Sequence, residues 1–265
     1  HPADRPRARR HPRRADRLGT PRGPAALAYA RPFFDLQLHF ARAVSALSGS
    51  PWARVLLDYT NLYVRFGLGR DFDPAHPVWR EYVAGLRGPG PDDAWTYRFY
   101  LTRADRPAGP PAVMRAGCFW YSRLDDGRIR LHFQNAETDG RSPLDAEHLG
   151  RRRADLAALF DHVKRTWDRP PRVVGASWLY NLPAYRRLFP PAYLATARVV
   201  GRRFRSMPLW GQFLDRRGEI RERTQREFVG RLGRQSSLEG LDHCFPLQVL
   251  SLEASATEFH DFYRI

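Results

Sequence analysis

Hydrophobic residues in the first third of the chain recur every three or four positions, which is the spacing of an amphipathic helix. The segments that follow this spacing are residues 33–47, 50–66 and 77–86. Ser50 and Pro51 suit the start of the second helix, and Gly67 suits its end. We therefore predict a helical amino-terminal unit over residues 33–91, which ends in the turn-forming stretch RGPGPDD.

Beyond this stretch the hydrophobic period changes to about two, the period of a half-buried strand. The first residues to alternate with polar neighbours are Trp95, Tyr97, Phe99 and Leu101. The dipeptide Asp126-Gly127 suits a hairpin turn. A strand is also predicted to begin at Val173 and to break at Asn181. The other predicted strands are residues 95–101, 113–124, 128–134, 193–204, 209–214 and 246–253.

Helical spacing returns in the second half of the chain. The strongest signal covers residues 142–167, where Ser142 and Pro143 suit an N-cap and a first turn and an apolar stripe follows. Shorter helices are predicted after Pro183, at residues 222–232 and after Ser255. This order of elements predicts an α+β fold, in which residues 92–265 form a mixed central sheet flanked by helices.

The composition is that of a folded protein, with 43% hydrophobic and 13% aromatic residues among 265. Part of the formal net charge of +16 lies in residues 1–32, which hold nine arginines and two aspartates. We predict that these residues form a disordered, Arg- and Pro-rich tail. A nucleic-acid-binding arm is the alternative, since clustered cations release counterions from phosphates. Because the other basic residues are spread along the chain, nucleic acid is not the expected partner.

Transmembrane and secretory signals are missing from the sequence. No apolar run reaches the roughly 18 residues that a membrane-spanning helix requires, and the basic amino-terminal segment lacks the apolar core of a secretory signal. These features predict a cytoplasmic protein without a membrane partner. The two cysteines, Cys118 and Cys244, are expected to be reduced, structural thiols.

Three short sequences carry a resemblance to a known family: RIRLHFQNAE, TDGRSPLDAEHLGRRRADLAALF and SWLYNLPAYRRLF. In this order they suit a central strand, a loop with a long helix, and a further strand with a short helix. Over residues 113–214 the chain resembles the acyl-CoA-binding core of the GNAT N-acyltransferase superfamily, and Asn181 and Ala184 match its frequent Asn-x-x-Ala. The chain is also similar to the GNAT-like carboxy-terminal domain of uncharacterised bacterial proteins, through LHF, SPL and SWLY.

The resemblance implies acyl-CoA as the cofactor, with its pyrophosphate bound by a loop and a helix N-terminus. The residues that it assigns to cofactor binding are Asn135, Gly140, Arg141, Ser142, Ser177 and Asn181. The family's loop usually reads Gln or Arg, two residues, Gly, one residue, then Gly or Ala, whereas this chain offers one glycine there. Pro143 lacks an N–H, and Asp145 and Glu147 would oppose a bound phosphate, so a plain capped helix is the alternative.

N-acyl transfer requires one group that takes the proton of the amine and another that protonates the leaving thiolate. Glu137 and His132, at the end of the central strand, are the candidate bases. The resemblance places a tyrosine acid seven residues after Asn181, but Leu188 occupies that position, so Tyr185 is the candidate acid. Each of these residues has a structural role as its alternative. No spacing such as H-E-x-x-H is present, so no metal is expected.

The resemblance implies an acyl-CoA-dependent N-acyltransferase that acts on an unidentified amine, or a relative that keeps only the cleft. The alternative is a non-catalytic binding or interaction module with the same fold. The enzymatic hypothesis requires two neighbouring parallel strands, which end near Glu137 and Asn181, to diverge at their carboxyl ends and leave room for a ligand.

Overall fold

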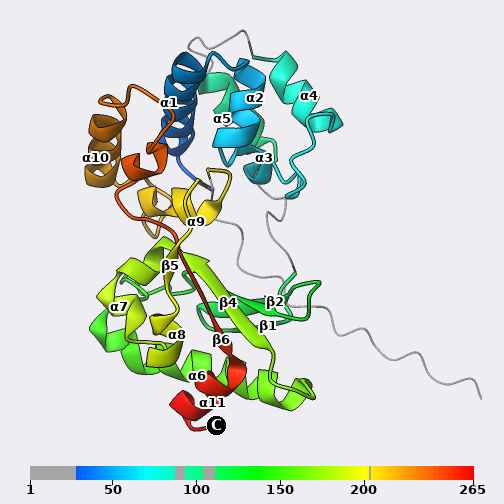
Figure 1. The fold of residues 1–265 in the computed structure, drawn as a ribbon, viewed down its shortest axis with the longest axis vertical. Coiled ribbons are helices and arrows are strands. Elements are labelled where there is room, and N and C mark those ends of the chain that lie inside the picture. The colour runs from blue at the N-terminus through cyan, green and yellow to red at the C-terminus, as the bar shows by residue number, and fades with distance from the viewer. Residues whose placement is uncertain (1–27, 87–92, 104–110, 203) are drawn as a thin grey trace, which may run out of the picture.

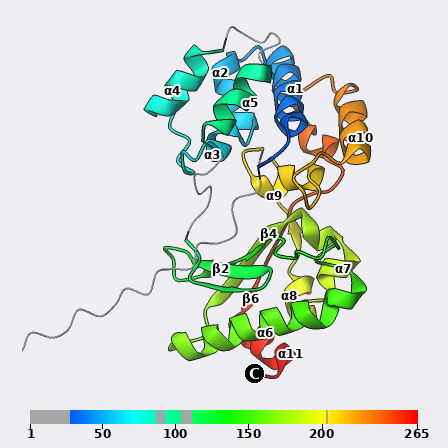
Figure 2. The same ribbon diagram turned by 180° about the vertical axis from the view of Figure 1, so that it is seen from behind.

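The computed structural model describes residues 28–86, 93–103, 111–202 and 204–265. In the described part of the chain a layer of helices lies over one side of a mixed sheet, and further helices cover the opposite side (Figures 1 and 2). The predicted α+β fold, with a mixed sheet flanked by helices, is confirmed. The predicted domain boundary at residues 87–91 lies outside the described residues, as does all of the predicted tail up to residue 27.

The described residues form a six-stranded sheet in the order β1-β2-β3-β4-β6-β5. Its strands are β1 (Met114–Ala116), β2 (Phe119–Arg123), β3 (Ile129–Phe133), β4 (Arg172–Ser177), β5 (Arg198–Val199) and β6 (Leu250–Ser255). Neighbouring strands are antiparallel except for β3 and β4, which run parallel. Gly117, with φ of 51°, turns β1 into β2, so the predicted strand 113–124 is a hairpin. The predicted turn at Asp126-Gly127 joins β2 to β3, and Gly127 has φ of 79°.

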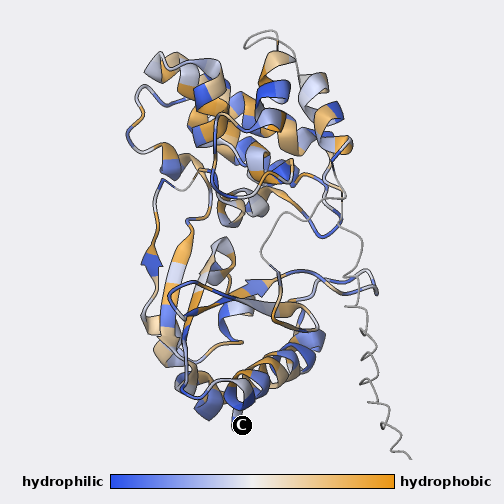
Figure 3. Ribbon diagram, turned by 90° about the vertical axis from the view of Figure 1, so that its right-hand side faces the viewer, coloured by the Kyte–Doolittle hydropathy of each residue, from blue (hydrophilic) through white to orange (hydrophobic). Residues whose placement is uncertain are grey.

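One face of the sheet is covered by α6 (Leu149–Thr166) and α11 (Ala256–Tyr263). Hydrophobic and hydrophilic turns alternate along α6 in Figure 3, as expected of a helix with one buried face. Shorter elements complete this side: η1 (Ala146–His148), η2 (Trp178–Asn181), α7 (Pro183–Arg186) and α8 (Pro191–Ala195). Alternate strand residues such as Phe119, Tyr121, Ile129 and Leu131 point into this core. We call this face the α6 side.

The opposite face lies below the helical layer. This layer contains α1 (Arg31–Ser48), α2 (Trp52–Tyr59), α3 (Leu62–Arg65), α4 (Pro77–Ala84), α5 (Asp93–Leu101), α9 (Met207–Trp210), η3 (Gly211–Phe213), α10 (Glu222–Leu232) and η4 (Leu241–Cys244). Its hydrophobic core combines residues from 33–100 with residues from 204–249. Ala176 of β4 packs against this core, and a Cβ on Gly211 would lie 3.3 Å from the indole nitrogen of Trp178. The helical layer therefore rests on the carboxyl end of β4.

Several predicted elements are wrong. Residues 95–101 form helix α5 instead of a strand, because Thr96, Phe99 and Tyr100 are buried at helical spacing. Residues 193–204 contain the end of α8 and the two-residue β5. Residues 209–213 belong to α9 and η3, and Leu214 forms an isolated β-bridge with Ile220. Prolines open both α8 and α9, which favours a helical first turn.

Other predicted helices and strands form with boundaries that differ from the predicted ones. The helix expected from Ser142 begins only at Leu149, because Ser142 belongs to a turn in which Asp145 accepts its backbone N–H. The segment 50–66 splits into α2 and α3. The last strand covers Leu250–Ser255 instead of 246–253. The structure confirms the helices predicted at 33–47, 77–86 and 222–232, and Ser255 caps α11 through a hydrogen bond from the Thr257 N–H.

No helix among the described residues has both the length and the apolar character needed to cross a membrane.

Candidate functional site

The parallel strands β3 and β4 diverge. Their pairing consists of Ile129 with Val173 and Arg130 with Val174, at the amino-terminal part of both strands. Beyond these residues β3 continues to Phe133 along β2, and β4 continues to Ser177 along β6. Both strands are fully described, and no pair joins residues 131–133 to 175–177. The carboxyl ends are therefore separated, as the enzymatic hypothesis requires.

Aromatic side chains fill the α6 side of this divergence. A Cβ on Gly175 would lie 2.2 Å from the hydroxyl oxygens of both Tyr180 and Tyr193, which are 2.8 Å apart and hydrogen bonded to each other. The ring of Tyr185 meets that of Phe133 edge to face, with centroids 5.4 Å apart. Tyr185 is 2% exposed, and burial raises its pKa well above the usual tyrosine value. Its hydroxyl is therefore enclosed in a hydrophobic core on this side.

The loop after β3 contains most of the predicted cofactor-binding residues. The Asn135 side-chain oxygen accepts the Glu137 N–H at 3.0 Å. Gly140 has φ of 75°, which suits a glycine in a tight turn. The N–H of Arg141 donates to Asp139 at 2.9 Å, and that of Ser142 donates to Asp145 at 3.2 Å. The loop therefore directs these N–H groups at its own carboxylates and does not present them to a phosphate.

Glu137 belongs to a buried ionic cluster. One carboxylate oxygen lies 2.7 Å from Arg152 and the other lies 2.6 Å from Arg151. The side chain of Arg152 is 1% exposed and also lies 2.9 Å from Asp155, with its Nε–H poorly aligned for a hydrogen bond. Burial raises the pKa of Asp155 and that of the nearby thiol of Cys118. This cluster joins α6 to the β1–β2 turn and leaves Glu137 without a free oxygen for proton transfer.

A second polar pair lies at the same loop. The Nδ1 of His148 is 2.8 Å from the Ser142 carbonyl oxygen, so Nδ1 carries a proton, and Nε2 is 2.9 Å from an oxygen of Asp139. The hydrogen bond from the Arg141 N–H lowers the pKa of Asp139, and His148 contributes to the same shift. Glu137, Asp139 and His148 place possible metal ligands within 4.8 Å of one another. Because both Glu137 oxygens already contact arginines, the donor set does not fit a metal ion.

His132 lies on the other face of the sheet, toward the helical layer. Its ring stacks on Trp120 with centroids 3.7 Å apart, and its Nε2 is 2.9 Å from the Ser122 hydroxyl. Burial and the nearby cations Arg130, Arg70 and Arg115 lower its pKa to about 3. His132 is therefore a neutral hydrogen-bonding group near pH 7, located beside the start of the strand divergence.

Ser177 and Asn181 lie at the carboxyl end of β4. The Ser177 hydroxyl accepts the Leu179 N–H at 3.1 Å and so begins η2. The Asn181 amide donates to the carbonyl oxygens of Trp178 at 2.7 Å and Gln248 at 2.8 Å. Asn181 thus ties the end of β4 to the segment before β6.

The predicted site residues fall into groups that the sheet separates. The loop residues 135–142 follow β3, and Ser177 and Asn181 follow β4 across the divergence. Tyr185 lies on the α6 side, whereas His132 points to the helical layer, so these two candidates do not face each other. The sequence analysis did not find Arg152, although an arginine within the apolar stripe of α6 was a usable signal.

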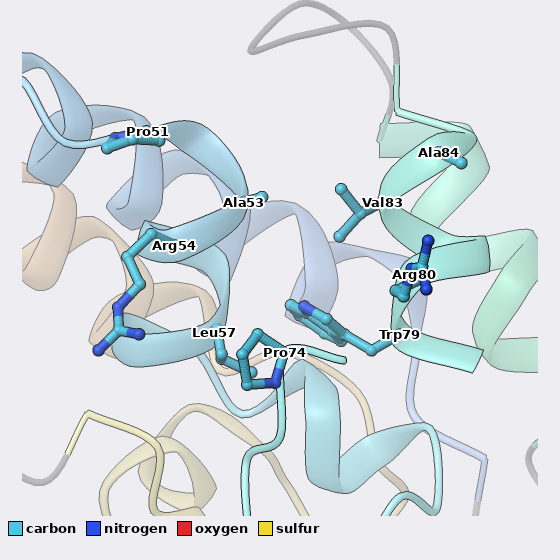
Figure 4. A pocket seen from close by; sticks show the side chains of 9 residues that line it. All are labelled: Pro51, Ala53, Arg54, Leu57, Pro74, Trp79, Arg80, Val83 and Ala84. Carbon is cyan, nitrogen blue, oxygen red and sulfur yellow. The ribbon is translucent and has the colours of Figure 1, made fainter. Parts of the chain in front are cut away.

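An apolar pocket of about 440 Å³ lies elsewhere, between α2 and α4 in the helical layer (Figure 4). Leu57, Trp79 and Val83 contribute to its walls, and Arg54 and Arg80 also line it. Arg54 is paired with Asp58 of its own helix. No predicted site residue lines this pocket.

A comparison of the chain with protein-family models, with curated proteins and with solved structures finds no match.

Proposed function

We propose that the chain is a GNAT-like, acyl-CoA-dependent N-acyltransferase. The single observation that carries the proposal is the divergence of β3 and β4 after two paired positions, while each strand keeps its outer neighbour to its end. Separated parallel strands leave main-chain polar groups without a strand partner, and an extended amide-containing ligand can pair with such groups. The pantetheine arm of acyl-CoA is a ligand of this kind.

The described residues suit one part of acyl-CoA, the pantetheine arm, but not its pyrophosphate. The divergent ends of β3 and β4 suit the pantetheine arm, and residues 177–181 border the gap. The loop at Arg141 and Ser142 does not suit the pyrophosphate, because carboxylates already accept both N–H groups. We therefore expect the arm and the acyl group, rather than the nucleotide, to supply most of the binding energy.

In the proposed reaction the amine nitrogen forms a bond to the acyl carbon, the carbon–sulfur bond breaks, and the amine proton passes through solvent to the thiolate. Acyl-CoA supplies the activated acyl group. His132 is neutral and has no described partner on Nδ1, so it can accept a hydrogen bond that orients the amine. Glu137, held by two arginines, positions the loop.

Isothermal titration of the full chain with octanoyl-CoA, octanoyl-pantetheine and 3′-phospho-ADP tests this proposal. We expect octanoyl-CoA to bind at micromolar concentration, octanoyl-pantetheine to bind within about tenfold of it, and 3′-phospho-ADP to bind weakly. Absence of octanoyl-CoA binding at millimolar concentration would refute the proposal. Thiol release in the presence of a mixed amine panel then separates catalysis from binding.

The N–H groups of Arg141 and Ser142 already donate to carboxylates of their own loop. This pairing favours a second candidate function, a non-catalytic module that binds a ligand between the strands. This candidate predicts acyl-pantetheine binding without thiol release from any amine mixture. The paired variant Asp139→Asn with Asp145→Asn weakens the acceptors of both loop N–H groups. If it raises octanoyl-CoA affinity without producing turnover, the binding module is the better description, whereas turnover by the unmodified chain excludes it.

A further inference from the structure

Cationic and aromatic side chains form a cross-strand row on the helical-layer side of the sheet. Arg115 of β1 lies opposite Trp120 of β2, and Trp120 lies opposite His132 of β3. The Arg115 guanidinium is 5.5 Å from the Trp120 ring centroid, and the His132 ring stacks on the same indole at 3.7 Å. In the next row Ser122 lies opposite Arg130. We call Arg115, Trp120 and His132 the cationic row.

The cationic row is covered in part and open in part. Ser122, on the same face of β2, is 2% exposed, so the face is covered there. Arg115 is exposed, and Trp120 and His132 are partly exposed. A ligand can therefore reach the row from its Arg115 end.

The helical layer adds a further cation to this face. Arg70 lies in the segment between α3 and α4 and forms no ion pair with a described residue. The positive charge of Arg70 contributes to the lowered pKa of His132. Arg70 is exposed as a whole residue, but partial burial of its guanidinium lowers its own pKa.

The nearest carboxylate in the strand register does not neutralise the row. Glu253 of β6 lies opposite Val174, which in turn lies opposite Arg130, so Glu253 points to the same face. Its two oxygens already contact Arg172 at 2.5 Å and Arg128 at 3.4 Å. No carboxylate of a described residue forms an ion pair with Arg115 or Arg70, and Arg115 donates one hydrogen bond, to the side-chain oxygen of Gln134 at 3.5 Å.

We propose that the cationic row and Arg70 bind the anionic group of the acceptor, which is a small primary amine that also carries a carboxylate or phosphate. Guanidinium groups recognise both oxyanions through paired N–H donors. An anion held there would place an amine two or three bonds away beside the His132 ring, at the start of the strand divergence. Identification of this group as the acceptor depends on the proposed transferase function.

Binding measurements test the proposal without turnover. The full chain is titrated calorimetrically with O-phosphoethanolamine and ethanolamine, and with β-alanine and propylamine, at constant ionic strength. We expect O-phosphoethanolamine to bind at least about tenfold more tightly than ethanolamine, and β-alanine at least about tenfold more tightly than propylamine. Arg115→Gln and Arg70→Gln should each weaken O-phosphoethanolamine binding about tenfold. Arg223→Gln, an exposed charge change on α10, is the matched control and should leave binding unchanged.

A second readout locates the ligand. The imidazole NMR signal that disappears in His132→Gln should shift during the O-phosphoethanolamine titration, and circular dichroism should show that all variants remain folded. Equal affinity for anionic and neutral amines, or equal losses in Arg223→Gln and Arg115→Gln, would overturn the proposal. If Arg70→Gln and Arg115→Gln weaken octanoyl-CoA but not O-phosphoethanolamine, the anion site belongs to the cofactor and the proposal is also wrong. If O-phosphoethanolamine binds but octanoyl-CoA does not, the proposed transferase function is refuted and the proposed anion site is retained.

Discussion

At Gly175 the backbone of β4 lies close to two buried tyrosine side chains. An added Cβ would lie 2.2 Å from the hydroxyls of Tyr180 and Tyr193, which are buried and hydrogen bonded to each other. We expect Gly175→Ala to lower the free energy of unfolding by about 1–3 kcal/mol, because neither ring can move without disturbing the core. Urea unfolding followed by circular dichroism measures this change.

Gly150 provides the control for Gly175. It lies near the start of α6, and a Cβ there would meet nothing within 4 Å. Gly150→Ala should leave stability unchanged or raise it by up to about 1 kcal/mol, since alanine favours a helix. If both alanine variants were as stable as the unmodified chain, the close packing of the two tyrosines on β4 would be contradicted.

His132 makes stability depend on pH. Its pKa is about 3 in the folded chain, below the ordinary value of 6.5, so between these values the unfolded state binds a proton that the folded state does not. Stability should therefore fall as the pH decreases below about 6.5. We expect His132→Gln to remove about 1 kcal/mol of the loss between pH 7 and pH 5, after allowance for solvent screening of a partly exposed ring. Parallel urea titrations at the two pH values provide the measurement, and an unchanged loss would count against a neutral His132.

At the scale of elements, the ion cluster of α6 joins the helix to the β1–β2 turn. Arg152 and Arg151 contact different oxygens of Glu137, but the side chain of Arg152 is 1% exposed and that of Arg151 is 59% exposed. We expect Arg152→Leu to destabilise the chain by about 3–5 kcal/mol, because it leaves the Asp155 carboxylate without its buried cation and Glu137 with only the exposed Arg151. Thermal unfolding, or loss of soluble protein, detects this effect.

Arg151→Leu serves as the comparison for Arg152→Leu. It removes the same charge from an exposed position and should change stability by less than about 1 kcal/mol. Similar losses in the two variants would contradict the assignment of Arg152 as the buried partner of the cluster.

The elements that the sequence predicts well carry strong local signals. The turn at Asp126-Gly127 combines a glycine with positive φ and an aspartate that accepts the Arg128 N–H, and the strand after it forms as expected. The helix at residues 222–232 also matches α10. By contrast, Trp95 to Leu101 contains hydrophobic residues at both strand and helix spacing. Packing of Phe99 against Phe66 and Tyr82 in the helical core favours the helix, which local alternation could not reveal.

The candidate site was predictable only in part. Sequence order placed Glu137 and Asn181 after adjacent parallel strands, and the structure has this arrangement. The partners of these residues depend on long-range contacts, such as Glu137 with Arg152 and Asn181 with Gln248, which have no short-range signature. The row formed by Arg115, Trp120 and His132 likewise requires the register of three strands.

At the scale of the whole molecule, neither hydrophobic core is made from one continuous segment. The helical core contains residues from 33–100 and 204–249, while the sheet core contains residues from 118–193 and 252–259. The chain therefore passes between the layers several times, and neither layer can complete its core alone. We expect urea unfolding followed by tryptophan fluorescence and by circular dichroism to give one coincident transition.

Trp178 tests this coupling because its indole lies between the layers, near Gly211 and 5.5 Å from the Arg221 guanidinium. Trp178→Ala should lower stability by about 2–4 kcal/mol and separate the two unfolding curves. Trp167→Ala, at the far end of α6, should leave the curves coincident. Separate transitions in the unmodified chain would contradict a coupled molecule.

The position of β6 has a consequence for synthesis on the ribosome. This strand follows all the others in the sequence, yet it lies between β4 and β5 and pairs with every residue of β4. Until residues 250–255 emerge, a nascent chain would expose one whole edge of β4 to other unfinished polypeptides. Slow translation of the codons for residues 250–255 would then prolong a stage prone to aggregation, and chaperones that shield strand edges should improve the yield.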